Sequence, residues 1–252
     1  MEILHYKNYL LHLADTNLIL AQRLTEWCGH GPILEQDIAV SNIALDLLGQ
    51  ATYFYDQVVL LEDQATTADD LAMLRTEREF KNLLIAELPN GDFSQTVAKL
   101  FFYESYYVLL LENLEISPII SISNIAKKAL KESKYHLKWS SEWMIRLGDG
   151  TEESHARVQK SVDYLSPYLA EMFTPSKDEL VLSDAGQIVA VESLKDAWLA
   201  RINKVMDEAF LQLVWPPKTI QLGGKDGLHT EYLGFVLAEM QSMQRTYPGL
   251  KW

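Results

Sequence analysis

Apolar residues recur along this 252-residue chain at intervals of three and four positions, which is the spacing that places side chains on one face of an α-helix. In the first such stretch, the buried face is predicted to hold Leu11, Ala14, Leu18 and Ala21. Glycine and proline stand mainly between the stretches, where they mark helix ends. The predicted helices cover about residues 7–28, 34–61, 70–87, 94–114, 123–147, 152–173, 193–214 and 229–247.

A few local features add detail to this helical pattern. The least regular part, residues 174–191, predicts a short hairpin near residues 180–189. In the second helix Ile38, Leu45 and Tyr53 are predicted to face the core, and Ser94 is predicted to cap the fourth helix. Because no change of composition marks a boundary, we predict a single domain over residues 1–252.

Four acidic residues stand among apolar residues on the predicted core faces of four long helices: Asp15, Asp46, Glu104 and Glu132. Burying a charge is unfavourable unless it is paired or bound to a metal. In carboxylate-bridged di-iron bundles, two helices each supply a Glu and two others each supply Glu-x-x-His. The pattern therefore predicts an all-α fold, with a ferritin-like four-helix bundle core and additional C-terminal helices.

The two histidines of the di-iron pattern are missing. Gly49 stands three residues after Asp46 and offers no ligand, and Tyr135 stands three residues after Glu132. We therefore expect a degenerate di-iron site, with no catalytic residue and no bound metal or cofactor in this chain. Its positions are Asp15, Asp46, Gly49, Glu104, Glu132 and Tyr135.

One histidine does share a predicted core face with an acid. His136 stands four residues after Glu132, where it can bind a metal or pair with a buried acid, and we favour the acid pair. We expect the four acids to form a hydrogen-bonded polar core with Asn42, Tyr53, Tyr135 and His136. A metal-binding oxidase that uses the residual carboxylates and His136 stays open as an alternative, and so does a free-standing interaction protein.

Charge and cysteine content narrow the function classes. The formal net charge of −13 disfavours nucleic acid and anionic membranes as partners. Cys28 is the single cysteine, and neither a secretion signal nor an apolar run long enough to span a bilayer is visible, so we expect a cytoplasmic protein. The glycine-rich loop 223–227 lacks the spacing of a phosphate-binding loop, although Lys225 and His229 are able to meet an anionic group.

Longer motifs carry a family resemblance. They include Glu26-Trp27-Cys28-Gly29-His30-Gly31-Pro32 and the segments 42–51, 88–93, 131–137, 146–151, 223–231 and 244–249. Over essentially its whole length the chain resembles the PaaC-type family, the structural subunits of bacterial ring 1,2-phenylacetyl-CoA epoxidases, which are multicomponent phenylacetyl-CoA monooxygenases.

The resemblance implies a member of an oxygenase complex that is not itself the catalyst. It implies that a homologous catalytic subunit holds the di-iron centre and binds phenylacetyl-CoA, while this chain stabilises that subunit. A small bridging subunit and a reductase with NADPH, flavin and an iron–sulfur cluster would complete the complex. The missing histidines agree with this role. The sequence leaves open which residues form the interface and whether loop 223–227 contacts acyl-CoA.

Overall fold

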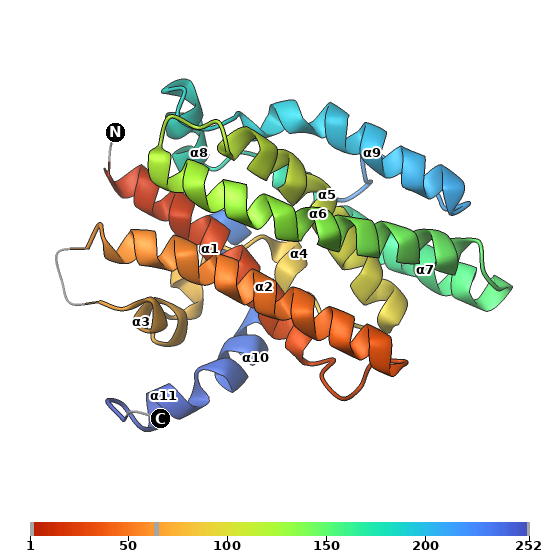
Figure 1. The fold of residues 1–252 in the computed structure, drawn as a ribbon, viewed down its shortest axis with the longest axis horizontal. Helices are drawn as coiled ribbons and strands as arrows, with labels where there is room; N and C mark the ends of the chain where they lie inside the picture. The colour runs from red at the N-terminus through yellow and green to blue at the C-terminus, as the bar shows by residue number, and fades with distance from the viewer. Residues whose placement is uncertain (1–2, 63–65, 251–252) are drawn as a thin grey trace. The chain divides into compact units, whose positions relative to one another are not determined.

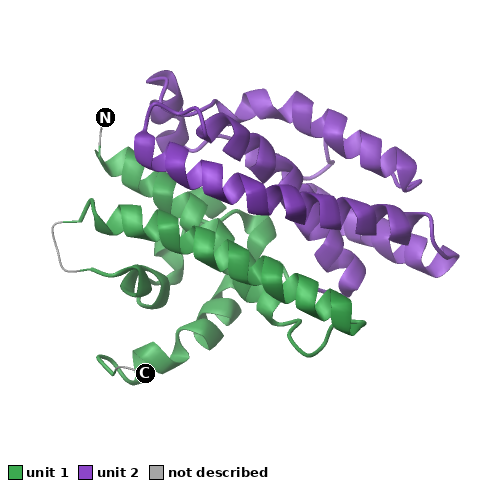
Figure 2. Ribbon diagram, viewed as in Figure 1, with its two compact units in different colours: residues 1–89, 223–252 green, residues 90–222 purple. Residues whose placement is uncertain are grey.

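The computed structural model describes residues 3–62 and 66–250, and no β-strand occurs in these ranges (Figure 1). The all-α prediction is therefore confirmed. The chain forms two compact units, the first from residues 1–89 and 223–252 and the second from residues 90–222 (Figure 2). The prediction of a single domain over residues 1–252 stays a prediction.

The first unit is built on two long helices, α1 (Ile3–Thr25) and α2 (Leu34–Val59). A short turn containing Gly29, with a φ of 80°, reverses the chain and returns α2 antiparallel beside α1. Most of α1 is buried, because apolar residues occupy most of its circumference. The remaining elements are α3 (Ala68–Met73), a 3₁₀ turn (Glu77–Glu79), α4 (Leu84–Glu87), a 3₁₀ turn (Gly224–Asp226), α10 (Glu231–Met240) and α11 (Ser242–Thr246).

The second unit repeats this plan with α5 (Phe93–Leu114) and α6 (Ile120–Gly148), which are also joined by a short connection and lie antiparallel. Helix α5 is the more deeply buried, and its aromatic residues Phe101, Phe102, Tyr103, Tyr106 and Tyr107 are all in the core. The remaining elements are α7 (Glu152–Leu165), a 3₁₀ segment (Ser166–Phe173), α8 (Lys177–Asp184), a 3₁₀ turn (Val191–Leu194) and α9 (Lys195–Glu208).

The helix predicted over residues 70–87 is wrong. Helix α3 ends at Met73, and α4 begins only at Leu84. The interruption is stabilised by polar groups, because the backbone N–H of Lys81 donates to the buried carboxylate of Asp15. Periodicity cannot detect this bend, since its cause lies 66 residues away in the sequence.

The predicted core face of α2 is also wrong. Ile38 and Leu45 are 51% and 63% exposed, and Tyr53 is half-buried. The buried stripe instead runs through Val40, Ile43, Ala44, Leu47, Ala51, Phe54 and Val58. Because α2 carries apolar residues on more than one face, a 3.6-residue period alone does not decide which face enters the core.

Three smaller predictions are corrected by local features of the sequence, two of them helix caps and one a proline. Residues 180–189 do not form a hairpin, because Ser176 and Glu179 form a capping box that begins α8. Asp92 rather than Ser94 caps α5, and the Ser94 hydroxyl donates to the Asp92 carboxylate. The helix predicted over 152–173 tightens to 3₁₀ after Leu165, because Pro167 has no N–H to continue the α-helical ladder.

Candidate functional site

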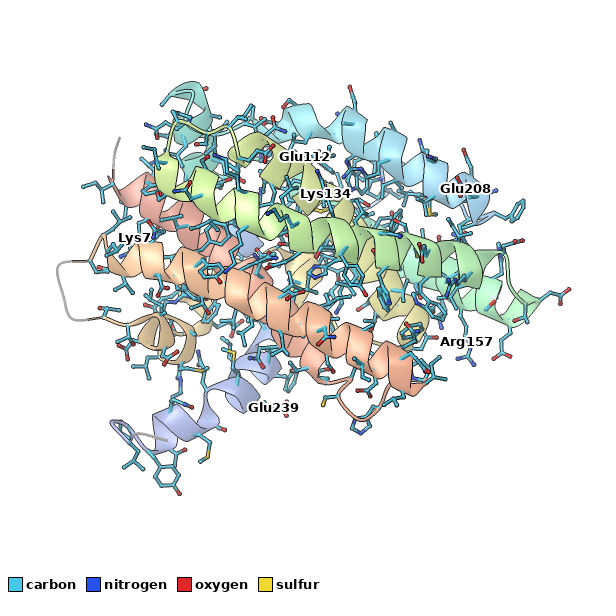
Figure 3. The ribbon with its side chains drawn as sticks, in the orientation of Figure 1. Lys7, Glu112, Lys134, Arg157, Glu208 and Glu239 are labelled. Atoms are coloured by element: carbon cyan, nitrogen blue, oxygen red, sulfur yellow. The ribbon has the colours of Figure 1, made fainter. Side chains whose placement is uncertain are left out.

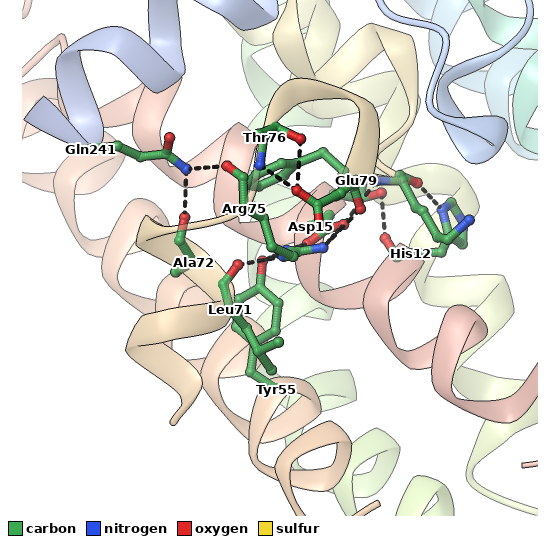
Figure 4. Close-up of polar contacts among 12 residues, drawn as sticks. His12, Asp15, Tyr55, Leu71, Ala72, Arg75, Thr76, Glu79 and Gln241 are labelled. Atoms are coloured by element: carbon green, nitrogen blue, oxygen red, sulfur yellow. Dashed lines mark hydrogen bonds and ion pairs between the residues drawn. The ribbon is translucent and has the colours of Figure 1, made fainter. Parts of the chain in front are cut away.

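Asp15 is the acid on the buried face of α1, and its side chain is fully buried (Figure 4). Both of its oxygens accept hydrogen bonds. Oδ1 accepts from the Tyr55 hydroxyl at 2.5 Å and from the Arg75 Nη2, while Oδ2 accepts from the Arg75 Nη1 at 3.1 Å and from the Lys81 backbone N–H at 2.8 Å. A carboxylate offers about four lone-pair sites, so these four donors occupy the acceptor capacity of Asp15.

Arg75 supplies the positive charge that balances Asp15. Burial is the largest single influence on the pKa of the Arg75 guanidinium and lowers it. The charge and hydrogen bond of Asp15, together with the charges of Tyr55 and Glu79, outweigh burial, so the pKa lies above its ordinary value. The guanidinium also lies over the Phe80 ring, 4.3 Å from its centroid. Burial and the charge of Asp15 raise the pKa of Tyr55 well above its ordinary value, so Tyr55 remains a neutral phenol that donates.

The segment between α3 and α4 is folded so that Arg75 is held in place. Thr76 and Glu79 form a capping box just after Arg75, in which the Thr76 N–H donates to the Glu79 carboxylate at 2.7 Å. From the C-terminal part of the same unit, the buried Gln241 amide donates to the carbonyls of Ala72 and Arg75, each at 3.0 Å (Figure 4). Arg75 is therefore positioned by contacts on both sides of its backbone.

In the second unit, Glu104 on α5 and His136 on α6 form a fully buried pair. The distance from His136 Nδ1 to Glu104 Oε1 is 3.0 Å, and both side chains have no exposed surface. The acid pairing favoured for His136 is thus present in the structure. In the described part of the chain, Glu104 Oε2 has no hydrogen-bond partner. Glu104 is therefore less completely satisfied than Asp15.

Similarity to known proteins extends over nearly the whole chain. The family model described as phenylacetic acid catabolic protein matches residues 3–252. The chain belongs to this family. It is 43% identical over 244 residues to a 1,2-phenylacetyl-CoA epoxidase subunit from Escherichia coli (strain K12), and the match covers 97% of this chain and 98% of that relative.

Membership in the phenylacetic acid catabolic protein family confirms the resemblance that the sequence motifs carry. Together with the helical structure, it confirms the predicted fold class, which is all-α and ferritin-like with four long helices and additional C-terminal helices. Within the described ranges no helix combines the length and the apolarity that crossing a bilayer requires.

The other positions predicted for the degenerate site differ from Asp15 and Glu104 in burial. Asp46 on α2 and Glu132 on α6 are half-buried, and Tyr135 is 55% exposed. At Gly49, apart from the adjacent residues and the backbone of the same helix, no described atom lies within 4 Å of the place where a Cβ would stand, so a side chain has space there. The expected participation of Tyr135 in a buried polar core is wrong, because its side chain is largely in solvent.

Two further predicted core partners are corrected in the same way. Asn42 is exposed and Tyr53 is half-buried, so neither belongs to a fully buried network. The tyrosine that does bond a buried acid is Tyr55, two residues further along α2. Within either unit, as far as its residues are described, no three His, Cys, Asp or Glu side chains gather closely enough to hold a metal.

These donor sets do not fit a di-iron centre. Iron in such a centre needs carboxylate oxygens with free lone pairs and two imidazoles. The oxygens of Asp15 are occupied by protein donors, and a glycine and an exposed tyrosine stand at the two imidazole positions. The residues present therefore favour neutralisation of Asp15 by Arg75 and of Glu104 by His136 over neutralisation by iron.

Glu87 is a further buried carboxylate of the first unit, and it was not singled out from the sequence. Glu87, at the end of α4, accepts from Asn82 Nδ2 at 2.9 Å, from His229 Nδ1 at 2.9 Å and from the Thr230 N–H at 2.6 Å. His229 Nε2 lies 2.9 Å from the Phe80 carbonyl oxygen. Glu87 is thus the anionic group that His229 meets, and the pair fixes the C-terminal segment to residues 80–87.

The protonation state of His229 follows from its two contacts. Because a carboxylate and a carbonyl only accept, both ring nitrogens of His229 act as donors and the ring is an imidazolium. Burial is the largest single influence and works against this charge. The hydrogen bond and charge of Glu87, with the Phe80 carbonyl and the charge of Glu77, together outweigh burial and raise the pKa of His229 above its ordinary value of 6.5. The buried Glu87–His229 contact is therefore an ion pair.

Proposed function

We propose that this chain is the non-catalytic structural subunit of a multicomponent phenylacetyl-CoA epoxidase that acts in phenylacetate degradation. The observation that carries the proposal is the complete occupation of the Asp15 carboxylate by Tyr55, Arg75 and the Lys81 N–H. A carboxylate whose lone pairs are all bonded to protein donors has none to give to iron. The similarity to a subunit of 1,2-phenylacetyl-CoA epoxidase supports membership in such a complex.

The proposal assigns the chemistry to other subunits. A homologous catalytic subunit would hold the di-iron centre and bind phenylacetyl-CoA, and this chain would stabilise it. A small bridging subunit would join the assembly, and a reductase with NADPH, flavin and an iron–sulfur cluster would deliver electrons. We expect the complex in the cytoplasm, in keeping with the single cysteine of this chain.

Iron analysis tests the absence of a metal site. The chain is expressed in iron-rich medium and purified, and its iron content and optical spectrum are measured beside those of the homologous catalytic subunit. We expect no stoichiometric iron in this chain. Arg75→Met is the matched variant, because it removes two of the four donors to Asp15 without supplying the missing imidazoles, and it too should lack a di-iron spectrum. Two irons per wild-type chain would overturn the proposal.

Co-expression tests the structural role. The homologous catalytic subunit is produced with and without this chain, and its soluble yield and epoxidase activity are compared at equal iron content. We expect both to rise when this chain is present and to fall when it is omitted. A catalytic subunit that is equally soluble and active alone would contradict the stabilising role.

A metal-binding oxidase remains the second candidate, because one observation favours it. Glu104 Oε2 is buried without a hydrogen-bond partner in the described part of the chain, and His136 is bonded to the other oxygen of the same carboxylate. This pair could contribute two ligands to a single metal. One metal per chain that is lost in His136→Gln, together with oxidase activity of the chain alone, would favour this candidate.

A further inference from the structure

Phe210 has a backbone conformation that its side chain disfavours. It follows the end of α9 with a φ of 55°, in the left-handed region where a Cβ crowds the following carbonyl. The Leu211 N–H bonds back to the Met206 carbonyl at 2.9 Å, which is the hydrogen bond of a helix end that normally places glycine at this position. Phe210 is nevertheless 67% exposed, so burial of its side chain does not compensate for the strain.

The residues on both sides of Phe210 are firmly held. Ala209 is fully buried against Gly148 of α6, where a Cβ on the glycine would stand 2.2 Å from the Ala209 carbonyl oxygen. On the other side, the Gln159 amide forms two hydrogen bonds with the Gln212 backbone, at 2.8 Å and 2.9 Å. The exposed ring is therefore presented on a fixed backbone, which lowers the entropic cost of binding something to it.

A hollow lies beside the ring, between Phe210 and one face of α7. Its volume is about 360 Å³, and its walls are His155, Gln159, Asp163, Phe210, Gln212 and Val214. Val214 is 64% exposed, so the hollow has two apolar walls, while Asp163 supplies a carboxylate. An aromatic face beside a carboxylate suits a long side chain with an apolar stem and a cationic head.

Two acidic residues precede Phe210 at the end of α9. The last turn of α9, immediately before Phe210, carries Asp207 and Glu208 and no basic residue (Figure 3 shows Glu208 there). Acids at a helix C-terminus are opposed by the helix dipole, so their placement does not stabilise α9. Like the strain at Phe210, these charges favour a function in binding.

We propose that this hollow receives an arginine side chain of another subunit of the epoxidase complex. The guanidinium would lie on the Phe210 ring and meet Asp163, while its stem packs against Val214. Arginine fits better than lysine because its planar head stacks on an aromatic ring and pairs with a carboxylate at the same time. This inference rests on the proposed function, since it requires that the chain bind other subunits.

The test measures binding of purified variants to the immobilised catalytic subunit and, separately, to the small subunit. Phe210→Gly should weaken binding to one of them about tenfold, while its unfolding midpoint stays equal or rises by about 2 °C because glycine accepts the left-handed conformation. Asp163→Asn should weaken binding of the same subunit and reduce its salt dependence. Phe235→Ala is the matched control, because Phe235 is 68% exposed but lies outside this hollow.

The outcomes separate the two proposals. If the wild-type chain binds neither subunit, the proposed function fails and this inference fails with it. If the wild type binds and Phe210→Gly binds equally well, only the inference fails. Loss of binding in Phe210→Gly but not in Asp163→Asn would overturn the assignment of a cationic side chain. An equal loss in Phe235→Ala would show a general apolar effect and would also overturn it.

Discussion

Asp15 in the first unit and Glu104 in the second are both fully buried, but the two units neutralise them differently. Asp15 meets a guanidinium, which is always charged, and every lone pair of the carboxylate has a donor. Glu104 meets an imidazole, which carries a charge only when it is protonated, and one oxygen of Glu104 has no hydrogen-bond partner in the described part of the chain. The first arrangement is complete, whereas the second leaves acceptor capacity unused.

The contrast between Asp15 and Glu104 shows that a buried carboxylate has two separate needs, balance of its charge and partners for its lone pairs. A metal both balances the charge of a carboxylate and occupies its lone pairs. Arg75 with Tyr55 and the Lys81 N–H meets both requirements for Asp15, so its charge is balanced and its lone pairs are occupied by protein donors. His136 can balance the charge of Glu104 but leaves Oε2 unbonded. Glu104 and His136 are therefore the residues at which a test for residual metal affinity is best aimed.

The largest expected change in the free energy of unfolding follows from the removal of Arg75. Arg75→Met leaves the Asp15 charge buried and unbalanced, and it should lower the free energy of unfolding by about 3–5 kcal/mol. Urea unfolding at pH 7 measures the change. The double variant Asp15→Asn/Arg75→Met should recover at least half of the loss, because the amide keeps partners in Tyr55 and the Lys81 N–H without a charge. A single variant as stable as the wild type would show that Arg75 does not balance Asp15.

The Glu87–His229 pair tests whether the type of cation or the completeness of bonding decides stability. It uses a histidine, as Glu104 does, but both of its oxygens are bonded, as those of Asp15 are. Loss of hydrogen bonds to charged groups predicts that His229→Gln lowers the free energy of unfolding by about 2 kcal/mol at pH 6.

The pH dependence of this pair has a definite sign. The folded-state pKa of His229 is raised above 6.5, so the imidazolium contributes its full stability below pH 6.5 and loses it as the pH rises through the raised value. The difference between the wild type and His229→Gln should therefore shrink as the pH increases above 6.5. Urea midpoints of both proteins from pH 6 to pH 9 measure it, and a difference that grows with pH would contradict the imidazolium.

The sequence predicted the long helices well because α1, α2, α5 and α6 depend on local periodicity. It failed at residues 70–87, where the deciding contact joins Lys81 to Asp15, and at the face of α2, where apolar residues on several sides allow more than one choice. Local spacing carries no signal for contacts made by distant segments, so both errors have the same physical origin.

In the candidate site too, residues on periodic helices were predicted, whereas residues joined by distant contacts were missed. The four acids and His136 were identified because each shares a helical face with apolar neighbours, and Asp15, Glu104 and His136 are indeed fully buried. Arg75 was missed because it lies outside regular structure, 60 residues from Asp15. His229 and Glu87 are 142 residues apart, and no pattern in a single sequence pairs them. A buried acid does require a cation somewhere, and that requirement is the signal available from the sequence.

The smallest expected change in the free energy of unfolding is that of Glu104→Gln, and it tests directly whether the second oxygen of Glu104 lacks a partner. In Glu104→Gln the carbonyl can keep the contact with His136, and the amide NH₂ replaces an oxygen that has no partner to lose. The free energy of unfolding should change by less than about 1 kcal/mol. Glu87→Gln is the matched variant, because each Glu87 oxygen accepts from N–H donors and an amide NH₂ would face one of them. Glu87→Gln should lower the free energy of unfolding by about 2 kcal/mol. Equal losses in the two variants, measured by urea unfolding at pH 7, would mean that Glu104 Oε2 is as fully bonded as the oxygens of Glu87, and the contrast between the units would then rest on the type of cation alone.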